Sequence, residues 1–430
     1  MRKMPDIIIN VFCASVFSHN KKHKCRRKPQ IIRKKINLDE HFDLLEQENE
    51  FQSYYCMSIS SFDTLFNLFA PVYISQRNHQ INVAIDRKSL QNKLQLTISW
   101  LAGGHFQALR AHGGLSRSSF YQSVDQVMEA IIGITDLRIS FPSTNEEALK
   151  VVEGFRDKST NGLFDGCVGA IDGWLCPILR PTPTSVNTVI DFFSGHYQKY
   201  GINVQLCCDS LCRFTEFSVS NPGSRADHLA YKNWGLSTIV KGLNNSYYII
   251  ADNAYVVTPY LMTPFDKLEL KKKNTLARDS FNFYLSQLRI RIEMAIGILV
   301  NKWRIFKKQL EVNTDKCKVI IHTEMCFHNF IVNEKMLTDM AYCPKLDAYK
   351  TKRDLNHSHD LVYLESTPHD KESNPKIYLT DESTNESNNT DFFESLGSLY
   401  RDFHVELIGQ NNMHRPQYNI NRNRNNRNLI

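Results

Sequence analysis

The sequence predicts an α/β fold in which a mixed sheet, flanked by helices, follows a helical N-terminal region. Three observations carry this prediction. Apolar residues recur at helical spacing over about residues 37–142, short apolar runs separated by turn residues begin near residue 164, and a long amphipathic helix is predicted over 278–308. The chain has 430 residues with 42% hydrophobic content, which is enough to bury more than one core. We therefore expect a helical domain over 37–142 and an α/β core over 164–336.

The first 36 residues are predicted to form a basic, disordered arm. Residues 1–35 hold eleven Lys or Arg against one acid, so the remaining 395 residues together carry a net charge of −3. Such an arm attracts phosphate backbones or a nuclear import receptor, and a merely solvated tail is the alternative. The apolar run 7–17 is too short to span a bilayer, and the lack of a clear cleavage site disfavours its reading as a secretion signal.

Cysteine usage favours a reducing compartment. The chain has eleven cysteines and no CxxC pair, which suggests neither a complete disulfide framework nor a zinc ribbon. Cys207, Cys208 and Cys212 cluster in apolar runs on either side of a predicted turn. We expect them to be buried as small hydrophobic side chains rather than to bind a metal.

The helical domain contains a helix-turn-helix-like pattern. A helix predicted over 87–101 ends at a pair of glycines, and Ser116 is the expected N-cap of a second helix with an apolar face. The other side of this second helix would offer Arg117, Tyr121 and Gln122 to the major groove of DNA. Compact helical packing without DNA contact is the alternative.

Four strands are predicted in the α/β core, at residues 167–171, 202–208, 214–219 and 247–251. The first three are expected to form an antiparallel meander, and a helix is expected to begin at Asp227. Asp172 and Asp252 each follow directly after a buried strand. Ligands gather at such strand ends when the strands are adjacent and parallel.

The strongest predicted helix, 278–308, carries one apolar stripe and one notable acid. The stripe advances in steps of three or four residues through Phe281, Leu285, Leu288, Ile292, Ala295, Leu299 and Trp303. Glu293 lies just beside this stripe, with Arg289 one turn earlier on the same face. The helix holds seven Lys or Arg, Arg291 among them. This surplus is expected to line a DNA channel, with a solvated basic face as the alternative.

The rest of the chain divides into a helix and a polar tail. Residues 309–336 are predicted to form one more packing helix, in which His328 is a structural histidine. Residues 344–430 turn polar and end in a run biased toward Asn and Arg. Such a composition cannot build a core, so we predict a mostly disordered tail.

Asp172, Asp252 and Glu293 together suggest a metal site. Mg²⁺ keeps several waters and is usually held by one or two carboxylates together with substrate phosphates. A site that cuts phosphodiester bonds can therefore be built from few protein ligands. The three acids are accordingly predicted to be both the catalytic residues and the metal ligands.

Several ordered motifs over about residues 58–335 resemble the PIF/Harbinger transposases and the Harbinger-derived nucleases. The motifs are GAIDG at 169–173, YGINVQLCCD at 200–209, NPGSRAD at 221–227, ADNAY with LMTPF within 251–265, FNFYLSQLRIRIEMAIGILVNKWRIF at 281–306 and HNFI at 328–331. The resemblance implies an RNase H-like DDE catalytic core preceded by a helix-turn-helix-like region. Matched position by position, it places the acidic triad on Asp172, Asp252 and Glu293, and makes Asp227 an accessory acid.

The resemblance also implies a chemistry and partners. It suggests a separate Myb-like or SANT-type DNA-binding partner. With it we expect cleavage of DNA by two Mg²⁺ or Mn²⁺ ions, a location in the nucleus and also in the cytoplasm, and no association with a membrane. The chain departs from the family at Trp174 and Leu175, where a small polar residue and a histidine are usual, and at Ala251 and Asn253. A domesticated transposase that binds DNA or a protein without cutting is the rival function.

Overall fold

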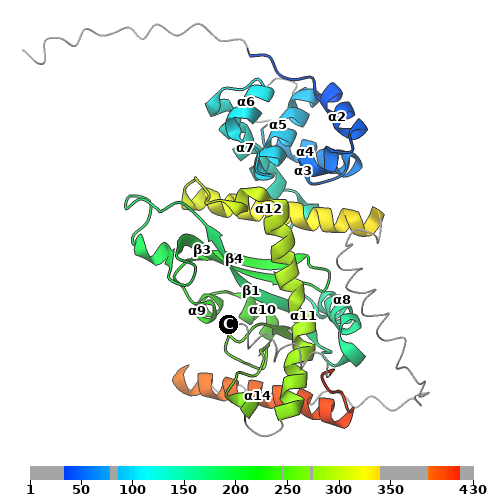
Figure 1. Ribbon diagram of the computed structural model, residues 1–430, viewed down its shortest axis with the longest axis vertical. Coiled ribbons are helices and arrows are strands. Elements are labelled where there is room, and N and C mark those ends of the chain that lie inside the picture. Colours follow the sequence, from blue (N-terminus) through cyan, green and yellow to red (C-terminus); the bar gives the residue numbers. More distant parts are fainter. Residues whose placement is uncertain (1–32, 78–85, 245, 272–274, 339–385, 417–430) are drawn as a thin grey trace, which may run out of the picture.

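The computed structural model describes residues 33–77, 86–244, 246–271, 275–338 and 386–416. The predicted apolar run 7–17, and most of the basic arm, lie outside these residues. The helical N-terminal region, the sheet and a C-terminal helix follow one another along the long axis of the molecule (Figure 1).

The N-terminal region is helical, as predicted. Its helices are α2 (Leu38–Gln47), α3 (Phe51–Tyr55), α4 (Ile59–Ser75), α5 (Arg87–Leu101), α6 (Phe106–His112) and α7 (Arg117–Ile132). The Ser116 side chain accepts a hydrogen bond of 3.1 Å from the backbone N–H of Ser119, so Ser116 caps α7 as expected. A short turn through Gly113 and Gly114 joins α6 to α7, so the helix-turn-helix-like pair consists of these two helices. We expected the helix at 87–101 as the first member of this pair, but α6, which the sequence did not predict, lies between it and α7.

Helix α8 (Asn145–Lys158) leads into a six-stranded mixed sheet. The strands are β1 (Cys167–Pro177), β2 (Phe193–Ser194), β3 (Lys199–Cys208), β4 (Phe214–Pro222), β5 (Tyr248–Ile250) and β6 (Leu261–Met262). Strand β3 pairs antiparallel with β1, β2 and β4, whereas β5 pairs parallel with β1 and with β6. Three antiparallel strands followed by parallel ones confirm the antiparallel meander and the RNase H-like arrangement.

The prediction was wrong about where β1 ends. We expected Asp172 just beyond a strand that stops at residue 171, but β1 continues to Pro177 and Asp172 lies in its interior. The strand continues because residues 172–177 remain paired with β3. Only the pairing of β1 with β5 stops near Asp172. Asp252, by contrast, does lie beyond the end of its strand, since β5 ends at Ile250 and one residue separates Ile250 from Asp252.

Helices cover both faces of the sheet. The long helix α11 (Thr275–Lys302) crosses one face of the sheet (Figure 1). All seven residues of the predicted apolar stripe, which α11 and the residue that follows it carry, are buried. On the other face, α8, α9 (Asp227–Lys232) and α10 (Leu236–Lys241) enclose a second, smaller apolar cluster. Short 3₁₀ turns occur at Thr135–Leu137, Thr160–Gly162, Ile190–Phe192, Glu269–Lys271 and Arg304–Lys307.

Helix α12 (Thr314–Thr338) joins the N-terminal helices to the sheet region. It packs against both α7 and β4, and the Lys316 ammonium pairs with Asp125 of α7. The buried ring of His328 bonds the backbone oxygen of Cys212 at 2.8 Å through Nε2, as expected of a structural histidine. The larger apolar cluster runs without a break from the N-terminal helices to α11 and α12.

The predicted disorder of the tail was wrong for residues 386–416. Helix α14 (Glu386–Gln410) packs against α11 and β6. Tyr400, Val405 and Ile408 are buried, so a narrow apolar stripe is enough to dock an otherwise polar segment. Charge pairs supplement this stripe, because Arg401 binds both carboxylate oxygens of Glu269 at 2.6 and 3.3 Å.

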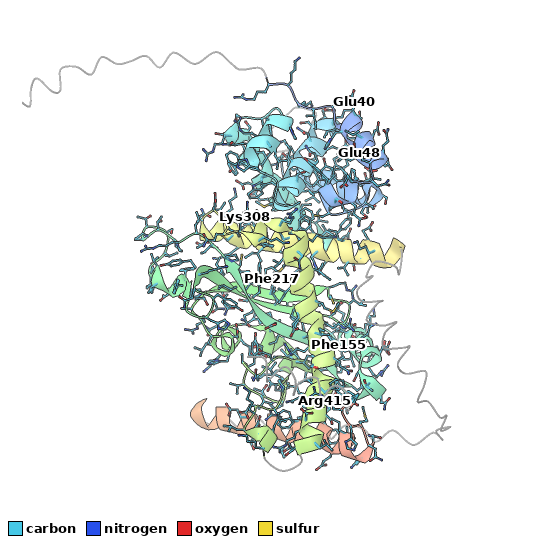
Figure 2. All side chains as sticks on the ribbon, in the orientation of Figure 1. Glu40, Glu48, Phe155, Phe217, Lys308 and Arg415 are labelled. Atoms are coloured by element: carbon cyan, nitrogen blue, oxygen red, sulfur yellow. The ribbon has the colours of Figure 1, made fainter. Side chains whose placement is uncertain are left out.

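A second arginine–carboxylate pair holds the end of this tail segment. Arg415 Nη1 lies 3.0 and 3.1 Å from the two carboxylate oxygens of Asp279 near the start of α11, and Figure 2 shows Arg415 beside that helix. The two oxygens share this one nitrogen, whereas Arg401 meets Glu269 through two nitrogens. The remaining tail residues, 344–385 and 417–430, lie outside the described part of the chain.

Two further properties bear on function. Among the residues that the structure describes, no helix is both long and apolar enough to cross a membrane. The eight described cysteines are buried and carry no disulfide. Cys207, Cys208 and Cys212 are among them, as expected of small hydrophobic side chains.

Candidate active site

Strand register brings Asp172 and Asp252 together. Strand β5 pairs parallel with β1, and its last residue, Ile250, is opposite Ala170. Two residues further on, the same register places Asp252 beside Asp172. The chain leaves the sheet here in a turn that Asp252 stabilises, since its Oδ1 accepts a hydrogen bond of 2.9 Å from the backbone N–H of Ala254.

The surroundings of Asp172 disfavour the charged form of its carboxyl group. Burial, followed by repulsion from Asp252, raises the pKa of the Asp172 carboxyl to about 6. The backbone N–H of Gly173, which donates to Asp172 Oδ1 at 2.8 Å, and the charge of Arg289 only partly offset this increase. A buried carboxyl with a raised pKa beside a second carboxylate is an environment that a bound cation relieves.

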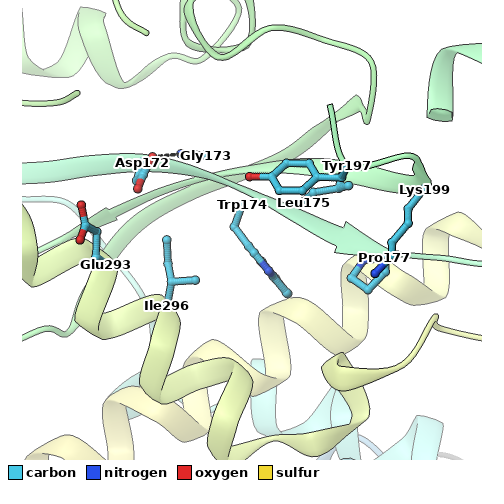
Figure 3. Close-up of a pocket in the computed structure, with 9 residues that line it drawn as sticks. All are labelled: Asp172, Gly173, Trp174, Leu175, Pro177, Tyr197, Lys199, Glu293 and Ile296. Carbon is cyan, nitrogen blue, oxygen red and sulfur yellow. Dashed lines mark hydrogen bonds between the residues drawn. The ribbon is translucent and has the colours of Figure 1, made fainter. Parts of the chain in front are cut away.

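Glu293 approaches Asp172 from the opposite side of a pocket. Figure 3 shows the Asp172 carboxylate on β1 and the Glu293 carboxylate on α11 pointing toward one another. Both line a pocket of about 390 Å³, together with Gly173, Trp174, Leu175, Pro177, Tyr197, Lys199 and Ile296. Glu293 also forms an ion pair of 2.6 Å with Arg289, one turn earlier on α11. The predicted triad therefore converges on one region, but its glutamate is held by an arginine.

Asp227 lies on the other face of β1. A Cβ atom added at Gly173 would come within 2.2 Å of Asp227 Oδ1, and neighbouring side chains of a strand point to opposite faces. Asp227 Oδ1 accepts hydrogen bonds from Asn203 Nδ2 at 3.0 Å and from Gln205 Nε2 at 2.9 Å. The hydroxyl of Tyr255 in turn donates to Gln205 Oε1 at 2.7 Å. Glycine is needed at position 173 because this carboxylate packs directly on the strand.

The donor set fits a hard divalent cation only in part. Asp172, Asp252 and Glu293 offer only oxygen, which suits Mg²⁺ or Mn²⁺, and the pKa of Asp172 is raised first by burial and then by the charge of Asp252. Within the described ranges, however, no three Asp, Glu, His or Cys side chains lie close enough together to hold a metal ion. Two carboxylates and substrate phosphates suffice for Mg²⁺, so the pair Asp172 and Asp252 fits while Glu293 must first leave Arg289.

The predicted DNA-binding residues do not share one surface. Arg117 and Gln122 are exposed on α7, but Tyr121 is half-buried, with the Lys316 ammonium 5.4 Å from its ring centroid. Tyr121 therefore contributes to the contact between α7 and α12. Arg291 lies roughly 160° around α11 from Glu293, by the helical rotation of about 100° per residue. It therefore does not face the pocket.

Sequence reasoning missed the residues that surround the acids. Tyr197 reaches the pocket from the turn between β2 and β3, and Lys199 from the first position of β3. On the other face, Gln205 holds Asp227 and Tyr255 holds Gln205. Gln205 left a signal in the sequence, as a polar residue within an apolar strand that is fully buried in the structure. The turn residues left none, because their position depends on how the hairpin folds back over β1.

The segment that holds these acids is similar to known proteins. Residues 171–329 match the family described as DDE superfamily endonuclease, a segment that contains Asp172, Asp227, Asp252 and Glu293. "Protein ALP1-like" from Arabidopsis thaliana is 23% identical over 331 residues, which cover 73% of this chain and 75% of the relative.

A second relative covers a shorter segment. "Putative nuclease HARBI1" from Xenopus laevis is 25% identical over 179 residues, which cover 41% of this chain and about half, 49%, of the relative. No solved structure matches the chain significantly. Over residues 171–329 the chain therefore matches the DDE superfamily endonucleases, and it is similar to Protein ALP1-like and to Putative nuclease HARBI1.

Proposed function

We propose that this protein is a metal-dependent endonuclease, similar to a transposase, that cleaves phosphodiester bonds of DNA. The observation that carries the proposal is the pairing of Asp172 with Asp252 beside a pocket that Glu293 faces. Members of the DDE endonuclease superfamily generally use divalent metals. The raised pKa of Asp172 is what we expect of a carboxylate placed to receive such an ion.

The proposed roles follow from the position of each acid. Asp172, between the other two, would contact both of two Mg²⁺ or Mn²⁺ ions, and Asp252 and Glu293 would each complete one coordination sphere. When bound, the ions would activate the attacking water or hydroxyl and stabilise the leaving oxygen. Asp227 and its hydrogen-bond network would support β1 from the other face, and Arg289 would hold Glu293 until the metal binds.

The free energy of its ion pair with Arg289 is small enough for Glu293 to leave Arg289 when a metal binds. An exposed ion pair between residues i and i+4 of a helix contributes only about 0.3–0.5 kcal/mol, and the Glu293 side chain is 46% exposed. A divalent cation beside two further carboxylates outweighs this contribution. The pair with Arg289 is therefore a weak competitor rather than a permanent block.

The closest test is cleavage of supercoiled plasmid by the purified full chain. We expect nicking in Mg²⁺ or Mn²⁺ and none in EDTA, and loss of nicking in Asp252→Asn. The matched control is Asp157→Asn, which changes an exposed aspartate of α8 outside the pocket. Nicking by the wild type in EDTA, or by Asp252→Asn at the rate of the control, contradicts the proposal.

A second function is favoured by two observations. The pair of Arg289 and Glu293, and the lack of a group of three metal-binding side chains among the described residues, fit a domesticated transposase that binds DNA or a protein without cutting. A nuclear location and a Myb-like or SANT-type partner belong to either proposal. Retention of DNA in a gel-shift assay, without nicking in any divalent metal, would support this second function.

A further inference from the structure

The pocket beside Asp172 has two chemically different ends. Asp172 and Glu293 form the acidic end, and Lys199, the first residue of β3, lies toward the other end. Trp174 and Tyr197 lie between them, the indole on the side of β1 that faces α11 and the Tyr197 ring over Leu175 (Figure 3). The pocket volume of about 390 Å³ falls within the roughly 300–1,000 Å³ of sites that bind small molecules, so we consider a single nucleotide rather than a duplex as its ligand.

Trp174 is placed in the pocket by the alternation of β1. It lies two residues after Asp172, so both side chains point to the same face of the strand. The edge of its indole packs on Phe306, with ring centroids 5.0 Å apart and planes at 80°. This contact holds the indole in place but leaves it partly exposed. A large aromatic side chain therefore stands beside the acids, at the position where the resembling family usually has a small polar residue.

Tyr197 reaches the pocket from the turn between β2 and β3. Its residue is 55% exposed, so the packing of the core does not explain the aromatic ring. Figure 3 shows its hydroxyl directed toward Asp172. Burial, and then the charges of Asp227 and Asp172, raise the pKa of the Tyr197 hydroxyl, which places it close to these acids.

Aromatic rings beside a cation form a known combination in proteins that hold single-stranded nucleic acid. Bases stack on the rings regardless of sequence, and lysine or arginine contacts the phosphates. In this pocket, Trp174 and Tyr197 supply the rings and Lys199 supplies the cation. The acidic end is where the scissile phosphate would lie.

We propose that this pocket binds one unpaired nucleotide of the cleaved DNA strand. Its base lies against Trp174, at the edge of β1 that the Tyr197 ring flanks from the other side, and its far phosphate lies toward Lys199. A base within a duplex is paired and stacked, so it must leave the helix to enter such a pocket. The proposal deepens the proposed endonuclease function and rests on it for the position of the scissile phosphate, but binding of a nucleotide can be measured without cleavage.

The test is quenching of tryptophan fluorescence by a short single-stranded oligonucleotide, pentathymidylate, with the full chain in Ca²⁺. Stacking on an indole quenches its emission, so we expect saturable quenching by the wild type. Trp174→Phe should lose most of the signal, whereas Trp100→Phe, in helix α5 of the N-terminal region, should keep it. Tyr197→Ala should weaken binding about tenfold or more, and Tyr197→Phe should restore it, because the ring and not the hydroxyl stacks.

The outcomes separate the pocket from the reaction. Unchanged quenching in Trp174→Phe, or wild-type affinity in Tyr197→Ala, overturns the pocket even if the protein nicks plasmid. Quenching that depends on Trp174, in a protein that never nicks, supports the pocket and contradicts the endonuclease function. An oligonucleotide with an abasic site at its centre should bind the wild type more weakly, and equal affinity would contradict stacking.

Discussion

Asp172 and Glu324 are two carboxyl groups that burial makes reluctant to ionise, yet only one of them belongs to a candidate site. Burial raises the pKa of both. Asp172 opens into a pocket and has Asp252, Arg289 and Asp227 close enough to affect its charge. Glu324, on α12, is 0% exposed, and neither of its carboxylate oxygens has a hydrogen-bond partner within the described residues.

The difference shows what turns a perturbed acid into a candidate ligand. A buried carboxyl without partners is satisfied by a proton, because the charged form has no compensation in an apolar core. A carboxyl beside a second carboxylate, at an opening, can instead be satisfied by a cation from solvent. Accessibility and neighbouring charge therefore distinguish the two groups, whereas the direction of the pKa shift does not.

The largest expected effect is the loss of cleavage in Asp172→Asn. Removal of the carboxylate that contacts both proposed metals should lower the rate of plasmid nicking by about a thousandfold or more, since this corresponds to about 4 kcal/mol of transition-state stabilisation. Glu324→Gln, the matched change at the other buried acid, should nick at nearly the wild-type rate. Equal loss in both variants would remove the distinction between the two groups.

The next effect is on the pH dependence of cleavage at limiting Mg²⁺. The pKa of Asp172 is raised to about 6, so its metal-binding, charged form is lost as pH falls below that value. The nicking rate should decline by about tenfold per pH unit below about pH 6. A rate that stays constant down to pH 4.5 would show that Asp172 does not control the reaction.

Glu324→Gln should stabilise the fold at neutral pH. Burial raises the pKa of Glu324 above 4.5, so its neutral form favours the folded state below pH 4.5, and this stability is lost as pH rises through the folded-state pKa. Glutamine does not titrate, so the variant should gain about 1–3 kcal/mol in free energy of unfolding at pH 7 and little at pH 4.5. Urea unfolding at both pH values measures the difference, and a gain that is independent of pH would contradict it.

The smallest expected effect concerns the pair that holds Glu293. Arg289→Gln should raise the affinity for Mn²⁺ about twofold, because the competing ion pair contributes about 0.3–0.5 kcal/mol. The control is Lys318→Gln, which removes a pair of 3.2 Å with Asp315 on the surface of α12. Isothermal titration calorimetry should show the increase in the first variant only. A decrease in Arg289→Gln would mean that Arg289 supports the metal site instead of competing with it.

The sequence predicted those helices whose apolar residues recur at regular spacing along the chain. Helix α5 has the predicted bounds, and the stripe from Phe281 to Trp303 is buried, because helical periodicity extends over many turns. The interior position of Asp172 could not be predicted, since the length of β1 depends on its pairing with β3, a partner distant in sequence. Helix α14 was missed because its own sequence is mostly polar, and its docking depends on partners far away in the chain, such as Glu269 for Arg401.

The acids of the candidate site could be named from the sequence, but the residues that surround them could not. Asp172, Asp252 and Glu293 stood out because each lies next to a periodic apolar segment. The ion pair of Glu293 with Arg289 follows from their spacing of four residues. The position of Tyr197 does not follow from any local pattern, because the turn that carries it contacts β1 only in the folded chain.

The most direct test of the account is the position of bound Mn²⁺ in a crystal of the full chain, located by anomalous scattering. The account predicts a peak in contact with the carboxylates of both Asp172 and Asp252, with Glu293 turned from Arg289 toward the metal. It also predicts that Asp172→Asn crystals lack this peak. A wild-type crystal in saturating Mn²⁺ with no peak between Asp172 and Asp252, and with Glu293 still paired to Arg289, would contradict the central claim.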